Sequence, residues 1–187
     1  MHSPHPPERP SQPACSGRRS RRPRQQIPAV VGTVDPRCVH HIINTPDDIP
    51  LAGIDAITDR GRALAAAALA LDYPLSDQCV LVIVDEHRVG LGMIVVDGAD
   101  HPDDIIDVAT ATTASIWRTG GRGVIAISVR PRTPPDTGDL EHWKEVDAIL
   151  ADANLDLIDW LIVADDLRWM CPNAEESRRW LLADELG

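Results

Sequence analysis

Arg130 and Arg132 lie in a proline-rich loop, directly before a helix pattern that begins near Asp139. Two guanidinium groups beside the unpaired backbone N–H groups of a helix start could bind a carboxylate or a phosphate. Asp136, Asp139 and Glu141 are close in sequence and could instead neutralise the arginines within the protein. We expect internal ion pairs, and keep both arginines as anion-binding candidates.

Other groups with metal-binding or catalytic chemistry are isolated in the sequence. Cys38, His40 and His41 could bind a metal ion, but no second group of ligands follows at a suitable spacing, so we expect a solvated turn. Glu86 and His87 would lie at the tip of a hairpin, where solvation is also expected. No Gly-x-Ser-x-Gly elbow and no nucleotide-binding loop is present. We therefore expect neither a bound metal nor a cofactor.

The elements that position these residues follow from the apolar periodicity. Continuous apolar runs predict strands over 79–84, 91–96, 124–129 and 155–163, with a short partner strand over 167–170. The first run should be buried on both faces. Helical patterns predict one long helix over 45–71, with a break near Gly61 as the alternative, and further helices from 102 to about 119, from about 139 to 154 and over 175–186.

The order of these elements predicts the fold class. After an N-terminal helix come strand, strand, helix, strand, helix, strand and strand. This alternation is typical of an α/β (mixed α+β) protein with a central mixed sheet flanked by helices.

Composition divides the 187 residues into a tail and one domain. Residues 1–36 contain eight of the 16 prolines and few large apolar side chains, so we expect a disordered basic tail followed by one globular domain over 37–187. Up to residue 26 the net charge is +5, from six arginines and one glutamate, and the remainder carries −16, from 12 basic and 28 acidic residues. An acidic domain of this kind repels phosphate backbones.

Partners and location are suggested only weakly. Arg18, Arg19, Arg21 and Arg22 could touch nucleic acid or an acidic partner, whereas a protein partner is open for the domain itself. No apolar run approaches the ~20 residues that span a bilayer, and no apolar signal segment is present, so we expect a cytoplasmic protein without membrane association. A single lysine, Lys144, among many arginines is typical of a GC-rich bacterial genome.

Three segments, 80–89, 123–131 and 155–163, resemble the JAB/MPN metallopeptidase superfamily and, within it, the bacterial RadC-like domains. The first resembles the family's hairpin, whose first strand ends on an aspartate. The second resembles the strand that leads into a His-x-His-Pro motif. The third carries Ile158-Asp159-Trp160 where the family has Leu-Asp-His. The resemblance covers about residues 77–166.

The resemblance implies a site, which is degenerate here. Family members hold zinc with two histidines and an aspartate, and an upstream glutamate activates water. The histidine positions fall at Ser128 and Arg130, and the carboxylate positions fall at about Asp77 and at Asp139 or Glu141. Neither serine nor arginine can replace a neutral imidazole, and an arginine would repel the cation.

We therefore expect a non-catalytic JAB-like domain, a pseudoenzyme that acts through protein contacts or a small anion. One alternative is a divergent hydrolase with an altered site around Asp77, Ser128 and Asp139. A second is an accessory protein that engages nucleic acid through the arginine-rich tail. A third is another family with the same strand order and an undefined activity.

Overall fold

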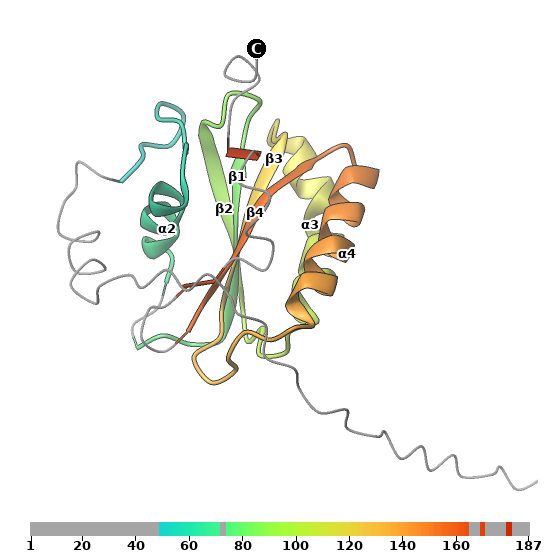
Figure 1. Cartoon of the computed structure of the whole chain (residues 1–187). Helices are drawn as coiled ribbons and strands as arrows, with labels where there is room; N and C mark the ends of the chain where they lie inside the picture. Colours follow the sequence, from blue (N-terminus) through green and yellow to red (C-terminus); the bar gives the residue numbers. More distant parts are fainter. Residues whose placement is uncertain (1–48, 72–73, 165–168, 171–178, 181–187) are drawn as a thin grey trace, which may run out of the picture.

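The computed structural model describes residues 49–71, 74–164, 169–170 and 179–180. Within them a five-stranded mixed sheet has the order β2-β1-β3-β4-β5 (Figure 1). The strands are β1 (Gln78–Val84), β2 (Gly90–Asp97), β3 (Gly123–Val129), β4 (Asp156–Val163) and β5 (Trp169–Met170). β3 and β4 are parallel, whereas the other neighbouring pairs are antiparallel.

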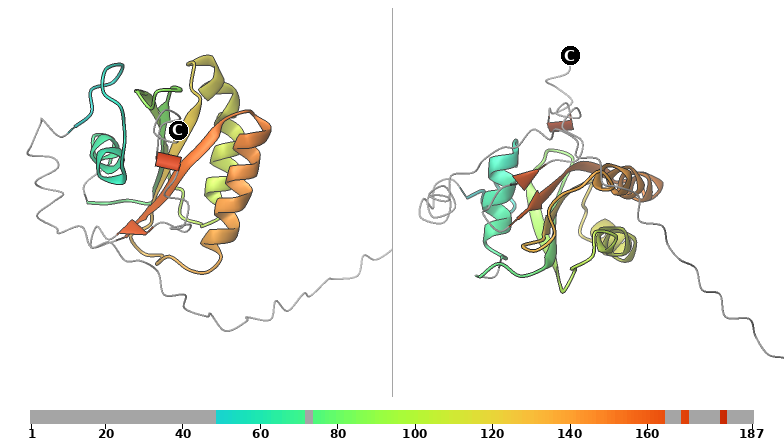
Figure 2. Two further views of the ribbon diagram at one scale, coloured as in Figure 1. Left: turned by 45° about the horizontal axis from the view of Figure 1, so that its top comes forward. Right: turned by 60° about the horizontal axis from the view of Figure 1, so that its bottom comes forward.

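Helices cover both faces of the sheet. Helix α2 (Arg60–Ala68) lies on one face, and α3 (Asp104–Arg118) and α4 (Asp139–Asp152) lie on the other (Figure 2). The predicted α/β fold and its element order from the first strand onward are confirmed. No helix in the described residues is long and apolar enough to cross a bilayer.

The core has two parts because alternate side chains of a strand point to opposite faces. On β1, Cys79, Leu81 and Ile83 pack toward α3 and α4. Val80 and Val82 pack toward α2. Every residue of β1 and of β3 is buried, so the prediction that the first strand is covered on both faces is confirmed.

The alanine-rich composition of α2 brings this helix close to the sheet. Ala63, Ala66 and Ala67 are buried against β1 and β3, since a methyl group leaves little space between helix and strands. Trp143, Val146 and Leu150 form the buried side of α4, as predicted for that segment.

The prediction of one unbroken helix over 45–71 is wrong for residues 49–59, whereas the alternative of a break near Gly61 agrees with the observed helix start. The helix begins only at Arg60, and the carboxylate of Asp59 caps it by accepting the N–H of Arg62 at 3.0 Å. Before this cap, the N–H of Gly53 donates to Gly90, and Ala56 bridges to Val89. These pairings to the hairpin hold residues 53–57 in a non-helical path.

Two other helix predictions need comment. The second helix begins at Asp104 rather than at residue 102, because His101–Asp103 form a turn in which the carboxylate of Asp104 accepts the N–H of His101 at 2.8 Å. The helix predicted over 175–186 lies outside the described residues except for 179–180. Trp180, expected to dock on the body, packs against the α2 side of the core.

Candidate functional site

The corner that the sequence singles out lies where β3 ends and α4 begins. Because β3 and β4 are parallel and α4 connects them, the carboxyl ends of both strands lie at the same edge of the sheet as the start of the helix. The N–H of Arg130 continues this pairing by donating to Val163 at 2.8 Å. This edge is the usual place for a site in open α/β folds.

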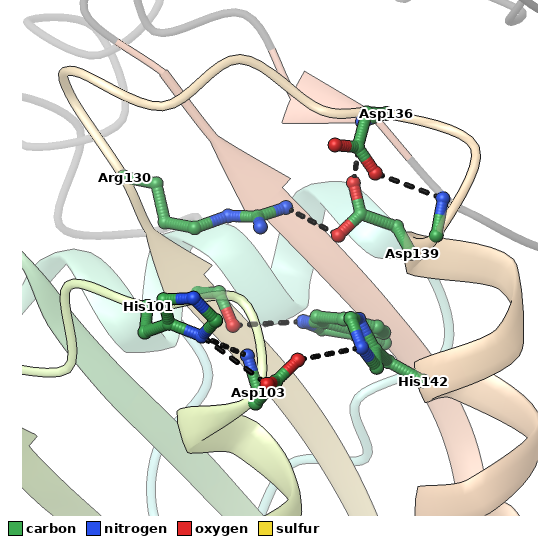
Figure 3. Close-up of polar contacts among 9 residues, drawn as sticks. His101, Asp103, Arg130, Asp136, Asp139 and His142 are labelled. Atoms are coloured by element: carbon green, nitrogen blue, oxygen red, sulfur yellow. Dashed lines mark hydrogen bonds and ion pairs between the residues drawn. The ribbon is translucent and has the colours of Figure 1, made fainter. Parts of the chain in front are cut away.

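A buried ion pair occupies the corner (Figure 3). Nη2 of Arg130 lies 2.8 Å from Oδ1 of Asp139, and each side chain is only 2% exposed. The second carboxylate oxygen of Asp139 accepts the N–H of Asp136 at 2.7 Å. Nε of Arg130 is buried without a hydrogen-bond partner in the described residues. The expected internal pairing is thus confirmed for Arg130, whose guanidinium is shielded from solvent.

Ser128 is bound to a neighbouring strand instead of to a base. Its Oγ accepts the indole N–H of Trp160 on β4 at 2.9 Å, and Ser128 itself is 6% exposed. On the other side it lies opposite Cys79 of β1 in the antiparallel register. A serine nucleophile needs an adjacent general base, and these contacts supply none.

Cys79 is the one thiol that the structure describes. Burial raises the pKa of Cys79 to about 12, although a hydrogen bond from Ser128 opposes this shift. The thiolate is the reactive form, so the native thiol should be inert near neutral pH.

We therefore expect the native protein to protect Cys79 from iodoacetamide at pH 8, with full labelling after denaturation. Mass spectrometry of the peptide that contains Cys79 measures this. Folding raises the pKa of Cys79, so the protonated thiol favours the folded state. This contribution to the free energy of unfolding is complete below the unfolded pKa of 9.0 and is lost as the pH rises toward about 12. Rapid labelling of the native thiol would show that the β1–β3 face opens.

The remaining candidates do not join the cluster. Asp77 is partly buried directly before β1, where its carbonyl accepts the N–H of Gly98 at 2.8 Å. Glu141 and Arg132 are exposed. Among the described residues, none of these three side chains forms an ion pair with Arg130 or Asp139.

A histidine–aspartate contact between the starts of α3 and α4 is not predicted by the sequence. Nε2 of His142 on α4 lies 2.8 Å from Oδ1 of Asp103, and Nδ1 of His101 lies 3.4 Å from Oδ2 of the same carboxylate (Figure 3). Each helix start carries a histidine and acidic residues in the sequence, but nothing local indicates that the two starts meet. In the part of the chain described, no group of three or more His, Cys, Asp or Glu residues is arranged to hold a metal ion.

A second buried carboxylate serves the opposite face of the sheet. Asp159, in the segment that resembles the Leu-Asp-His signature, is 3% exposed. Its Oδ2 accepts Nε of Arg60 on α2 at 2.6 Å and the indole N–H of Trp180 at 2.8 Å. Because Trp160 points to the other face, the two residues of this signature serve different sides of the core.

The hairpin tip behaves as expected. Glu86 and His87 are largely exposed, and their side chains lie 3.7 Å apart. The Cys38, His40 and His41 group and the arginines of the tail lie outside the described residues.

The comparisons add no family assignment. No protein-family model matches the chain, and a search of curated proteins finds no match.

Proposed function

We propose that this chain is a non-catalytic, RadC-like member of the JAB/MPN superfamily that acts by binding another protein. The observation that carries the proposal is the Arg130–Asp139 ion pair. The resemblance puts a zinc-binding imidazole at Arg130 and a zinc-binding carboxylate at Asp139 or Glu141. Here Arg130 and Asp139 neutralise one another, at 2.8 Å and with 2% exposure each.

The second imidazole position supports the same proposal. Ser128 accepts the N–H of Trp160 and is almost fully buried, so its oxygen faces the packed interior rather than a solvent-filled cavity. A catalytic zinc site keeps one coordination position open for water. Within the described residues, the ion pair and the indole hydrogen bond already occupy the groups that would have to face such a position.

Two alternatives weaken for related reasons. Of the two arginines that could bind a small anion, Arg130 is buried and already paired with Asp139. Arg132 is exposed, but Asp136 and Glu141 near the helix start add negative charge that opposes the binding of an anion. The divergent hydrolase requires an activated nucleophile. Among the described residues Ser128 has no hydrogen bond to a general base, and the neighbouring thiol of Cys79 is held protonated. Protein contacts remain, and a cytoplasmic location fits this proposal.

The test compares zinc binding by the full-length wild type and the Ser128→His/Arg130→His variant, which restores the His-x-His-Pro spacing. Elemental analysis and calorimetric titration with zinc provide the measurement. We expect the wild type to hold well below one zinc per chain and the variant to gain a site, with Asp139 released to coordinate. The matched control, Arg132→His/Pro134→His, adds the same pair of imidazoles to exposed positions of the same loop and should bind only weakly.

The outcomes separate the two parts of the proposal. Stoichiometric zinc in the wild type would overturn the non-catalytic assignment. If the double variant folds but binds zinc no better than the control, the proposed kinship with the JAB/MPN superfamily is wrong. The buried Arg130–Asp139 ion pair would then need another explanation.

A further inference from the structure

Residues 179–180 connect three separate elements of the body. The guanidinium of Arg179 donates to both carboxylate oxygens of Asp147 on α4, at 2.6 and 3.1 Å, and to the carbonyl oxygen of Leu157 on β4 at 2.7 Å. The carbonyl oxygen of Arg179 accepts a hydrogen bond from the guanidinium of Arg88, in the turn between β1 and β2, at 2.7 Å. This short segment therefore bridges a helix, a strand and a hairpin turn.

The two side chains of the segment serve opposite faces of the sheet. The guanidinium of Arg179 lies over the ring of Trp143, 4.8 Å from the ring centre, on the side that α4 covers. The indole of Trp180 packs against the α2 side of the core, and its N–H donates to the carboxylate of Asp159 at 2.8 Å. A bidentate ion pair, a cation–π contact and an indole hydrogen bond together suit an arginine followed by an aromatic residue.

The surface that receives these side chains is built from residues with other partners. Trp143 belongs to the buried side of α4. Asp159 also accepts Nε of Arg60 on α2 at 2.6 Å, so its buried charge keeps a partner when the indole leaves. The side chain of Asp147 is 27% exposed, so water can replace the arginine. The surface should therefore persist when residues 179–180 leave it.

We propose that this surface, formed by Trp143, Asp147, Leu157 and Asp159, is a docking site for a protein partner, and that residues 179–180 occupy it as an internal ligand. The partner presents an arginine followed by an aromatic residue. This assignment rests on the proposed function, protein binding, and adds the site and the chemistry of the partner. Charge supports it, because a chain with a formal net charge of −11 attracts a basic segment.

An internal ligand competes with the partner. Because residues 179–180 belong to the same chain, their effective concentration at the docking site is of the order of millimolar. A partner segment binds only those molecules in which the site is empty, so its apparent affinity falls with the empty fraction. The wild type should therefore bind a short basic–aromatic segment more weakly than a variant whose own site is empty.

Fluorescence anisotropy with a fluorescein-labelled peptide, Ser-Arg-Arg-Trp-Leu, tests the proposal. This peptide has the sequence of residues 177–181. The full-length variant Arg179→Ala/Trp180→Ala empties the docking site, and we expect it to bind the peptide roughly tenfold more tightly than the wild type does. The matched control, Trp117→Ala/Arg118→Ala, removes the same two residue types from exposed positions of α3 and should bind like the wild type.

Two further measurements show whether the binding is specific. Adding Asp147→Asn to the emptied variant should abolish the gain in affinity, because the amide cannot form the ion pair with the arginine of the peptide. A second peptide, Ser-Arg-Glu-Ala-Leu, lacks the central arginine and the aromatic residue, and should bind the emptied variant roughly tenfold more weakly. Circular dichroism shows whether each variant is folded.

Three results would overturn the proposal. One is a folded Arg179→Ala/Trp180→Ala variant that binds the first peptide no better than the wild type. Another is equal binding of the two peptides, which would indicate attraction by net charge alone. The third is an unfolded double variant, since residues 179–180 would then be a required part of the fold.

The zinc measurement keeps this proposal distinct from the proposed function. Stoichiometric zinc in the wild type overturns the non-catalytic assignment, whatever the peptide does. Failure of the peptide to bind, together with a low zinc content, removes only the docking site.

Discussion

Replacing Asp139 by alanine is expected to destabilise the protein by about 3–5 kcal/mol, because the buried guanidinium of Arg130 would lose its counter-ion. Both side chains are 2% exposed, so water cannot take the place of the carboxylate without opening the corner. The same carboxylate also accepts the N–H of Asp136 and so fixes the loop before α4. Urea denaturation followed by tryptophan fluorescence measures the change.

The matched control is Glu141→Ala, which removes an exposed carboxylate from the same first helical turn and should cost at most about 1 kcal/mol. The double variant Arg130→Met/Asp139→Leu removes both charges and should recover most of the stability, since a packed apolar pair avoids the desolvation of two ions. An Asp139→Ala variant as stable as Glu141→Ala would mean that the corner is hydrated, and the structural basis of the proposed function would be lost.

The variant Trp160→Ala should lower the free energy of unfolding by about 3–5 kcal/mol, because the indole is fully buried. This side chain fills the space between β4 and the two helices α3 and α4, and its ring lies 6.0 Å from the guanidinium of Arg130. The loss should therefore loosen the ion pair as well as leave a cavity. Thermal unfolding and denaturant titration are the measurements.

A more conservative change separates the hydrogen bond from the packing. Trp160→Phe keeps most of the ring but removes the N–H that binds Ser128, so we expect a loss of about 1–3 kcal/mol. In a double-mutant cycle with Ser128→Ala, the two effects should be non-additive if the bond is formed. Trp117→Phe is the control, because Trp117 is 42% exposed and the same substitution there should cost about 1 kcal/mol or less. Additive effects in the cycle would contradict the contact.

If the proposed kinship holds, the Arg130–Asp139 ion pair and the Trp160–Ser128 hydrogen bond explain how a JAB-like fold is kept without a metal centre. Ion pairing and indole packing stabilise positions that a metal centre would have to leave accessible. A change that improves stability at such a position removes the open coordination that catalysis needs. The Ser128→His/Arg130→His variant tests the reverse change, in which a zinc site is gained and the stability supplied by the ion pair is lost.

Local pattern was sufficient for the sheet and for α4. The run over 79–84 is apolar at every position and the run over 124–129 at every position except Ser128, and a strand between two helical layers favours that composition. The spacing of Trp143, Val146 and Leu150 indicates one buried helix face. In contrast, the stripe from Leu51 to Leu71 favours one long helix with a possible break near Gly61, yet before that break Leu51 and Ile54 are 59% and 70% exposed and not helical. Pairing of residues 53–57 with the hairpin overrode the local propensity there.

By itself, the sequence determined the element order, the burial of the first strand on both faces and the presence of Arg130 beside a set of acids. Only the tertiary structure decided that Asp139 is the partner of Arg130, that Trp160 binds Ser128, and that Asp103 joins His142. The physical reason is the separation of the interacting residues along the chain. Hydrophobic periodicity is a property of neighbours along the chain, whereas the choice among several nearby carboxylates, or between two helix starts, depends on how separate elements pack.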